Sequence, residues 1–335
     1  AGEVGGPVEG GIPFGFFTAA TGVTIYRGNA WPREYHGNLL VGDVANNIIF
    51  RARLETDGLS LLAKRADPDA EFLASTDIWF RPVQLANGPD GHLYVLDMYR
   101  GLIEGTAFLP ADILDHLDPV GGYDRGRIYR IVPRGSPPSS WPVPGVRTTA
   151  ALVRMLGDGN GWHRDTASRL LYQRQDKSAI EPLRQLALEC PLPEGRMTAL
   201  YSLQGLDGLD ANVVLQLLED PSVKVRQHAI RIAERLAADS DDVRDKLVAM
   251  ADTTDLDIAY QLAFSLGAVE SGNRNTALIS LMRHFGADPW LPFAVQSSLG
   301  EGAGEFFGML ASSKADRRQS HIREFLTRLA TQIAA

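Results

Sequence analysis

Two charged side chains lie within a predicted β-hairpin whose strands are otherwise mainly apolar. Residues 80–86 and 92–98 alternate in the manner of strands, and the turn-forming sequence NGPDG joins them. Arg81 lies near the start of the first strand and Asp97 near the end of the second. A charge within an apolar strand requires water, a ligand or an opposite charge beside it. We therefore predict that the hairpin forms a wall of a polar cavity. The alternative is a structural Arg81–Asp97 pair that ties the two strands together.

The segments that follow the hairpin offer further groups for binding a small polar molecule. Tyr99 and Arg100 come after Asp97, where the predicted strand gives way to a long loop, and function concentrates at such places. Arg125 and Arg127 flank a glycine, a geometry suited to a bidentate grip on a carboxylate or phosphate. We predict that these residues bind substrate. The alternative is an ordinary turn followed by a charged surface loop.

No group of side chains has the spacing of a metal site or of a catalytic set. The histidines of the β region share no metal-binding spacing, and three aspartates at intervals of three fit a solvated helix face better than a calcium loop. These residues are His36, His92, His116, Asp112, Asp115 and Asp118. The single cysteine, Cys190, excludes an internal disulfide, a CxxC zinc site and a CxxCH haem attachment. The sequence therefore assigns no metal ligand and no catalytic residue.

The composition is that of an ordinary globular chain of 335 residues, 44% of them hydrophobic. The 33 basic and 41 acidic residues give a net charge of −8, and no run of Lys or Arg occurs, so nucleic acid and anionic membrane are not expected partners. No stretch approaches the ~18 apolar residues of a membrane helix, and the leader at 1–16 lacks the order of a targeting signal. Ala1 in place of Met suggests a processed chain or a piece of a longer one.

The hydrophobic pattern divides the chain into a β region and a helical region. Short strands with turns between them recur through residues 17–135, as in a sandwich or in about two blades of a β-propeller. They are predicted at 23–27, 38–43, 48–54, 59–65, 80–86, 92–98 and 127–132. Prolines in the linker 136–147 stop both helix and sheet. From 148 to 335 the period becomes 3.6, and a succession of helices is predicted from 148–156 to 317–334.

The helical region contains an internal repeat. The phrase Arg-x-x-Ala occurs at 164–167, 196–199 and 226–229, at offsets of about thirty residues. Around the third copy, an Asp-Pro helix start and the small Ala229 are similar to the second helix of a HEAT repeat. We predict an α-solenoid of HEAT-like repeats whose helices brace the β region, the alternative being that its concave face binds a protein partner.

Four segments carry a resemblance to a known family. They read TGVTIYRGNAWPREYHGNLLVGDVANNIIFRARLE at 21–55, FLASTDIWFRPVQLANGPDGHLYVLDMYRGLIE at 72–104, DRGRIYRIVP at 124–133 and NGWHRDTA at 160–167. The chain resembles the C-terminal part of the membrane-bound dehydrogenase family of planctomycetes and their relatives. More distantly it is similar to the quinoprotein glucose and sorbosone dehydrogenases, which are β-propellers. The resemblance to the first family covers nearly the whole chain, because helical repeats follow the propeller there.

The resemblance implies the last blades of a partial β-propeller, followed by a HEAT-like solenoid. It implies the C-terminal part of an exported, periplasmic dehydrogenase for a sugar or polyol, inactive on its own, with pyrroloquinoline quinone and calcium as cofactors and a cytochrome as partner. In that family an arginine at the position of Arg81 lies over the quinone. Ala45 stands where the family has a lysine that helps bind it. The catalytic base and most calcium ligands would precede residue 1.

A second hypothesis comes from a different functional class. It is a non-catalytic module in which a degenerate propeller and a HEAT-like scaffold bind a carbohydrate or a protein. The absence of the lysine at Ala45 favours this alternative.

Overall fold

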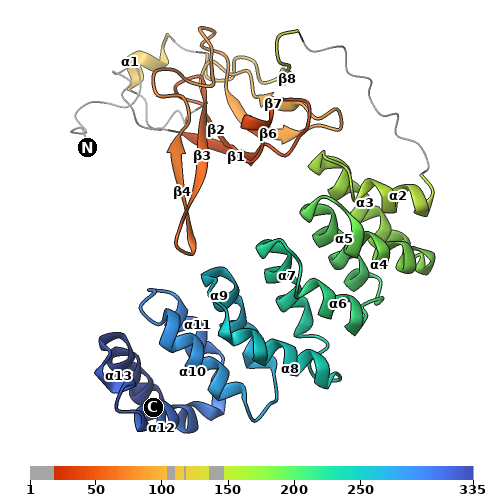
Figure 1. Ribbon diagram of the computed structural model, residues 1–335. Helices are drawn as coiled ribbons and strands as arrows, with labels where there is room; N and C mark the ends of the chain where they lie inside the picture. Colours follow the sequence, from red (N-terminus) through yellow and green to blue (C-terminus); the bar gives the residue numbers. More distant parts are fainter. Residues whose placement is uncertain (1–18, 104–109, 117, 136–146, 335) are drawn as a thin grey trace. The chain divides into compact units, whose positions relative to one another are not determined.

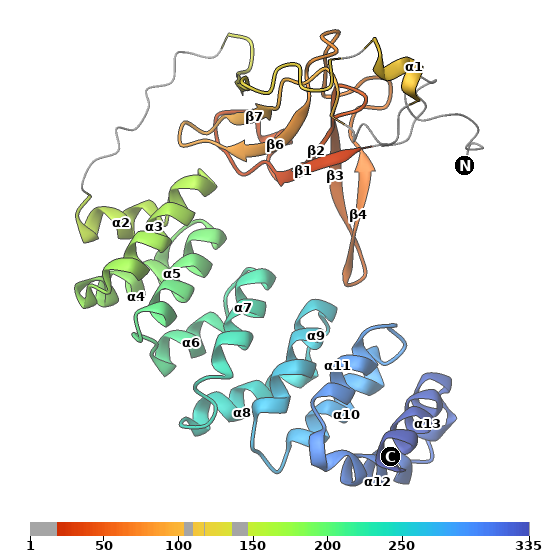
Figure 2. The same ribbon diagram turned by 180° about the vertical axis from the view of Figure 1, so that it is seen from behind.

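A computed structural model describes residues 19–103, 110–116, 118–135 and 147–334. Contacts between Cα atoms divide the chain into two compact units, one made mainly of residues up to 146 and the other mainly of residues from 147 onward. The first holds the β-sheets and the second the helices (Figures 1 and 2). The predicted leader 1–16 and nearly all of the predicted linker 136–147 lie outside the described residues.

The first sheet of the β unit is an antiparallel meander in which the order β1–β2–β3–β4 follows the sequence. Its strands are β1 (Ala20–Ile25), β2 (Leu39–Asp43), β3 (Ile48–Asp57), β4 (Ser60–Arg65) and the short β5 (Leu73–Ala74), which pairs with β3. Gly22 in β1 has φ +54°, and a Cβ there would lie 2.8 Å from the Cα of Gln84. Only glycine fits, because its backbone adopts a left-handed conformation and lies against another strand.

The second sheet contains the predicted hairpin and a third strand. Its members are β6 (Pro82–Asn87), β7 (Leu93–Asp97) and β8 (Arg127–Ile131), in that order and antiparallel. The register places Asp97 directly opposite Arg127. A short helix, α1 (Ala111–Leu114), lies within the long segment between β7 and β8.

The two sheets meet through their first strands, β1 and β6. The hydroxyl groups of Thr21 and Thr24 donate to the carbonyls of Pro82 (2.5 Å) and Leu85 (3.3 Å). Asn87 at the end of β6 donates to the carbonyl of Ile25 and accepts from the backbone N–H of Arg27. Polar edges of the two strands are thereby satisfied by each other, which orders the sheets side by side.

One aromatic cluster forms the centre of the β unit. Tyr26 is fully buried, and the ring of Trp31 stacks on it at 4.5 Å between centroids. The Tyr26 hydroxyl donates to the carbonyl of Gly91 (2.7 Å) and accepts from the backbone N–H of Trp31. The indole N–H of Trp31 donates to the carbonyl of Ile131 in β8. The loop after β1 thus connects to both the hairpin turn and the last strand, while Leu40, Ile49, Leu85, Leu93 and Val95 complete the core.

The second unit is a stack of helices paired along the sequence (Figure 1). The first members of the pairs are α2 (Thr149–Met155), α4 (Ile180–Glu189), α6 (Ala211–Leu217), α8 (Asp241–Ala249), α10 (Arg274–Phe285) and α12 (Ala303–Ser312). The second members are α3 (Gly161–Arg174), α5 (Pro193–Gly205), α7 (Val223–Ala233), α9 (Leu256–Ser265), α11 (Leu291–Ser297) and α13 (Ser320–Ala334). Second helices contact second helices of adjacent pairs, as α5 contacts α7 and α7 contacts α9. Among the described residues, each helix is too short or too polar to cross a membrane.

Local chemistry explains where several helices begin. Thr148, Asp210, Ser240 and Asp255 each accept a hydrogen bond from a backbone N–H of the first turn. Pro193 occupies the first turn of α5, where its missing N–H costs nothing. These caps are visible in the sequence, and the predicted helix boundaries agree with the observed ones to within a few residues.

The repeated Arg-x-x-Ala phrase has a structural role in each copy. The arginine donates through Nη1 to the carbonyl six residues earlier: Arg164 to Asp158, Arg196 to Cys190 and Arg226 to Asp220, at 2.6 to 2.7 Å. The alanine is fully buried in each copy, and Ala259 and Ala294 continue the series with the same burial. A small side chain lets adjacent helices approach closely, so the phrase fixes each second helix to the loop before it.

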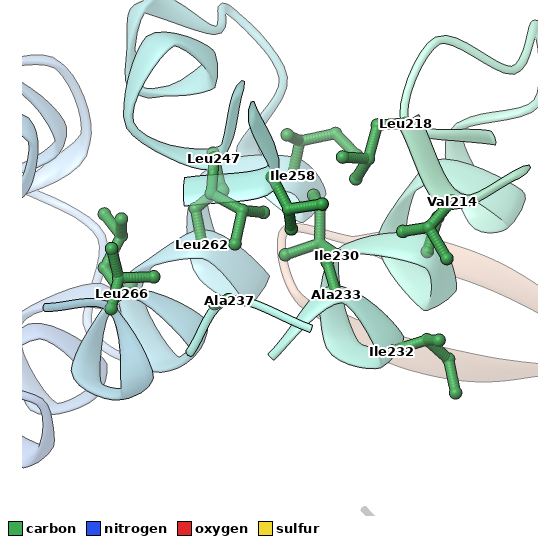
Figure 3. Close-up of a cluster of buried hydrophobic side chains, with 14 of the residues drawn as sticks. Val214, Leu218, Ile230, Ile232, Ala233, Ala237, Leu247, Ile258, Leu262 and Leu266 are labelled. Atoms are coloured by element: carbon green, nitrogen blue, oxygen red, sulfur yellow. The ribbon is translucent and has the colours of Figure 1, made fainter. Parts of the chain in front are cut away.

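Interlocking aliphatic side chains join adjacent repeats. Figure 3 shows Ile230 of α7 lying beside Ile258 of α9, with Leu247 of α8 above Leu262. These side chains are buried and belong to a single apolar cluster that runs through the whole helical unit. The arrangement is a β region followed by an α-solenoid, as the sequence predicted at this level of detail.

Candidate functional site

Arg81 lies just before β6 and joins three segments of the β unit. Its guanidinium donates through Nε to the carbonyl of Arg100 (3.0 Å), through Nη1 to that of Val44 (2.6 Å) and through Nη2 to that of Gly101 (2.6 Å). Every nitrogen of the group is therefore directed at a backbone carbonyl. Such bonds to a charged donor hold loops in place at about 1.5–3 kcal/mol each.

Asp97 is buried and organises the chain around it. Its Oδ1 accepts from the backbone N–H groups of Arg81 (2.8 Å) and Tyr99 (2.9 Å), and its Oδ2 accepts from Nε of Arg127 (2.6 Å). The predicted Arg81–Asp97 relation therefore exists, but the bond uses the backbone of Arg81 and not its guanidinium. Arg127, directly opposite in register, supplies the counter-charge.

Aromatic rings cover the Arg127 guanidinium. Its Cζ lies 4.1 Å from the ring centroid of Tyr99, which has φ +55°, and 5.5 Å from that of Tyr129. Asp77 accepts from Nη1 of Arg127 at 2.9 Å. Hydrogen bonds from the backbone of Trp79 and from Arg127 lower the pKa of the Asp77 carboxyl. Sequence reasoning missed Asp77 and Trp79, whose contact with this cluster depends on the fold.

The two remaining predicted residues, Arg100 and Arg125, differ in their surroundings. The guanidinium of Arg100 donates to the carbonyls of Gly122 and Tyr123 and so anchors the loop before β8. Arg125 is exposed, with its nearest carboxylate, Asp124, 3.7 Å away. The structure therefore brings Arg81, Asp97, Tyr99, Arg100 and Arg127 into one region and leaves Arg125 on its surface. Their role in substrate binding stays a prediction.

A quinone-dependent dehydrogenase needs groups that bind the quinone and ligands that hold a calcium ion. Within the described residues no three His, Cys, Asp or Glu side chains gather closely enough to hold a metal ion. The guanidinium of Arg81 is engaged with backbone carbonyls, and Ala45 has no charged group to offer. These residues therefore do not by themselves fit either cofactor.

A second candidate site lies on the helical unit. Within residues 164–334 of the described chain, the exposed large apolar side chains all belong to second helices or to the residue that caps one. They are Tyr172 in α3, Phe264 in α9, Trp290 before α11, Phe293 in α11 and Ile333 in α13. The first helices within this range, α4, α6, α8, α10 and α12, expose none of this kind among their described residues. We call the solvent-facing side of α3, α5, α7, α9, α11 and α13 the second-helix face.

A groove of about 440 Å³ opens on this face between α3 and α5. Its lining is aromatic and polar: Asp165, Ser168, Arg169, Tyr172, Thr198, Tyr201, Ser202 and Gly205. The Tyr201 hydroxyl lies 2.8 Å from Nδ1 of His228 in α7. Burial raises the pKa of Tyr201, and burial together with Arg231 and Lys224 lowers that of His228, so both groups are neutral near pH 7. The pair connects α5, which lines the groove, to α7 of the next repeat.

In comparisons with known proteins, the family match lies on the β unit. Residues 8–135 match a family described as a domain of unknown function (DUF7133). No curated protein matches the chain. Among solved structures, an engineered protein is 17% identical with a TM-score of 0.34, over 56% of this chain and 97% of that one. A designed armadillo repeat protein in complex with the peptide (KR)4 is 12% identical with a TM-score of 0.30, over 55% of this chain and 99% of that one.

Proposed function

We propose that this chain is a protein-binding module, and that the second-helix face of its solenoid holds the partner. One observation carries the proposal: the large apolar side chains exposed on residues 164–334 gather on one kind of helix. A partner that covers these side chains would remove their apolar surface from water, which favours binding. Aromatic and arginine side chains are also the groups that dominate binding energy at protein interfaces.

Phe264 and Phe293 allow an estimate of how much this face contributes to the binding free energy. Their exposed fractions are 43% and 52%, and the Arg328 guanidinium lies 4.2 Å from the Phe293 ring centroid. Full burial of a phenylalanine stabilises by about 1.5–3 kcal/mol, so covering the exposed half of each ring is worth about 1–1.5 kcal/mol. Together the two rings would strengthen binding by at least tenfold, because 1.4 kcal/mol corresponds to a factor of ten.

The test is affinity capture from the producing cells with three forms of the protein. The wild type, the variant Phe264→Gln with Phe293→Gln, and a control, Gln216→Ala, are compared by quantitative mass spectrometry. Gln216 is exposed on α6, a first helix, and its side chain forms no hydrogen bond with the residues that the structure describes. We expect proteins that are captured by the wild type and the control and are depleted at least tenfold with the double variant. Equal capture by all three would refute a binding role for this face.

A second candidate function rests on the contact between β1 and β6. The sheets are consecutive antiparallel meanders whose first strands lie side by side, as the inner strands of neighbouring propeller blades do. In this proposal the chain supplies the last blades of a quinoprotein-like sugar or polyol dehydrogenase, and the groups that bind the quinone come from blades outside this sequence. The full-length parent, given quinone, calcium and sugars, would reduce an artificial electron acceptor. Absence of that activity, with no quinone in the purified parent, would reject it.

A further inference from the structure

We infer that the second-helix face binds an extended, acidic peptide segment across α3, α5 and α7, with the groove beside Tyr201 receiving an apolar side chain between two carboxylates. The inference rests on the proposed function and adds the chemistry and spacing of the partner. It starts from two arginines, Arg169 and Arg231, that occupy equivalent places in the repeat. Each lies two residues after a buried alanine of the series, Ala167 or Ala229, and each is exposed.

Among the described residues, no carboxylate lies within 4 Å of either guanidinium group, and neither group donates a hydrogen bond. This contrasts with Arg164, Arg196 and Arg226, whose guanidinium groups are fixed on backbone carbonyls. Unpaired, solvent-exposed guanidinium groups on an interaction face favour carboxylate ligands, which they can bind through two parallel hydrogen bonds.

Tyr201 occupies the same position in the repeat between the two arginines, two residues after Ala199. Tyr201 and Arg169 both line the groove between α3 and α5. The positive charge of Arg231 reaches Tyr201 and His228 and lowers the pKa of both groups, against the effect of burial at Tyr201 and together with it at His228. Along the face, the cation Arg169 is therefore followed by the groove beside Tyr201 and then by the cation Arg231.

Three carboxylates lie near Arg169, Tyr201 and Arg231, but none is within 4 Å of either guanidinium in the described part of the chain. Glu234 in α7 accepts from the Ser265 hydroxyl of α9 at 2.5 Å, and its negative charge acts on Tyr201. Asp257 pairs with Lys224 at 2.8 Å, and Asp165 lines the groove and has an interaction of its own. The guanidinium groups of Arg169 and Arg231 therefore remain available to a ligand.

The geometry of stacked helices sets the spacing of the ligand. Adjacent packed helices lie about 8–10 Å apart, so α3 and α7, with α5 between them, are roughly 16–20 Å apart. An extended chain rises about 3.3 Å per residue, and residues an even number apart face the same side. Two carboxylates about six residues apart would therefore reach both arginines, and the residues two and four positions after the first carboxylate would face the same side, toward the groove.

A peptide suits this face better than a nucleic acid does. Two isolated guanidinium groups with a hydroxyl-lined groove between them cannot follow a phosphate at every nucleotide, and the net charge of the chain is −8. Nucleic acid is nevertheless included as an outcome of the test below.

The test uses the whole chain and fluorescein-labelled synthetic peptides, followed by fluorescence anisotropy at low salt. The probe is Glu-Ser-Leu-Gly-Leu-Ser-Glu, with carboxylates six residues apart and both leucines on the same side of the extended chain as the carboxylates. Matched probes replace both Glu by Lys, or bring the two Glu to adjacent positions. We expect the first probe to bind at least tenfold more tightly than either of the others, because a charge-assisted hydrogen bond contributes roughly tenfold in affinity.

Protein variants identify the groups responsible. Arg169→Gln and Arg231→Gln are each expected to weaken the first probe about tenfold and to reduce the salt dependence of binding. Arg154→Gln is the matched control, because Arg154 is exposed on α2, a first helix. Glutamine keeps the helix propensity close to that of arginine, and circular dichroism verifies that each variant is folded.

The outcomes separate this inference from the proposed function. If the Lys probe binds as well as the Glu probe, or if both Arg→Gln variants bind like the wild type, the acidic-peptide inference is wrong. Partner capture that still depends on Phe264 and Phe293 would leave the proposed function standing in that case. Tighter binding of a single-stranded oligonucleotide, lost in the same Arg variants, would also overturn the inference in favour of nucleic acid.

Discussion

The buried ion pair between Arg196 and Asp220 gives the sharpest test of how the solenoid is held together. Arg196 in α5 donates through Nε and Nη2 to the Asp220 carboxylate, at 2.6 and 2.7 Å, and Asp220 lies before α7 in the next pair. The two residues are 8% and 6% exposed. The same carboxylate accepts from the backbone N–H of Ser222 at 2.8 Å. One pair thus joins two repeats and the start of a helix.

We predict that Asp220→Asn lowers the free energy of unfolding of the helical unit by about 3–5 kcal/mol. Removing one partner leaves a buried guanidinium without its counter-charge, and this is the usual cost of such a break. For a unit of this length each kcal/mol shifts the melting temperature by about 2–4 °C. The expected decrease is therefore about 6–20 °C, measured from the far-ultraviolet circular dichroism of the helices.

The matched control is Asp257→Asn. Asp257 also bridges adjacent repeats, through Lys224 at 2.8 Å, but the Lys224 side chain is 63% exposed. Exposed pairs contribute about 0–1 kcal/mol, so this variant is expected to melt within about 4 °C of the wild type. A decrease of equal size in both variants, or a change below about 1 kcal/mol in Asp220→Asn, would refute the assignment of Arg196–Asp220 as a buried inter-repeat bond.

Three further predictions concern charge, burial and the predicted cofactor residue. A hydrogen bond from Arg283 lowers the pKa of the Asp316 carboxyl in the folded protein. The stability that this carboxylate contributes is present above its ordinary pKa of 3.8 and is lost as the pH falls through the lower folded pKa. Arg283→Gln should therefore make the free energy of unfolding less dependent on pH on the acid side. Burial raises the pKa of the Tyr26 hydroxyl to about 12 in the folded protein. The stability that this difference contributes is fully present below the unfolded pKa of 10 and is lost as the pH rises toward 12. An ultraviolet titration should show a late tyrosine that Tyr26→Phe lacks. Arg81→Lys should destabilise the β unit by about 2 kcal/mol or more in urea, because one ammonium cannot satisfy three carbonyls in different directions; unchanged stability would contradict the structural role.

The elements of both units could be predicted because their signals are local. Alternation at 80–86 and 92–98 with NGPDG between them determines a hairpin whatever surrounds it. The start of α9 at Leu256 follows from the cap at Asp255, and Ala229 indicates a close helix contact from its size alone. The order of β region and helical repeats needs no knowledge of contacts at long range.

The partners of charged and aromatic side chains were decided by the tertiary structure. The sequence placed Arg81 and Asp97 in one hairpin, but the carbonyls that hold Arg81 belong to Val44, Arg100 and Gly101, and the counter-charge of Asp97 is Arg127 on another strand. In the helices a period of 3.6 defines an apolar stripe without stating how much of it a neighbour covers. Only packing between repeats buries some aromatic side chains and leaves others, such as Phe264, open to a partner, because the covered area depends on groups far away in the chain.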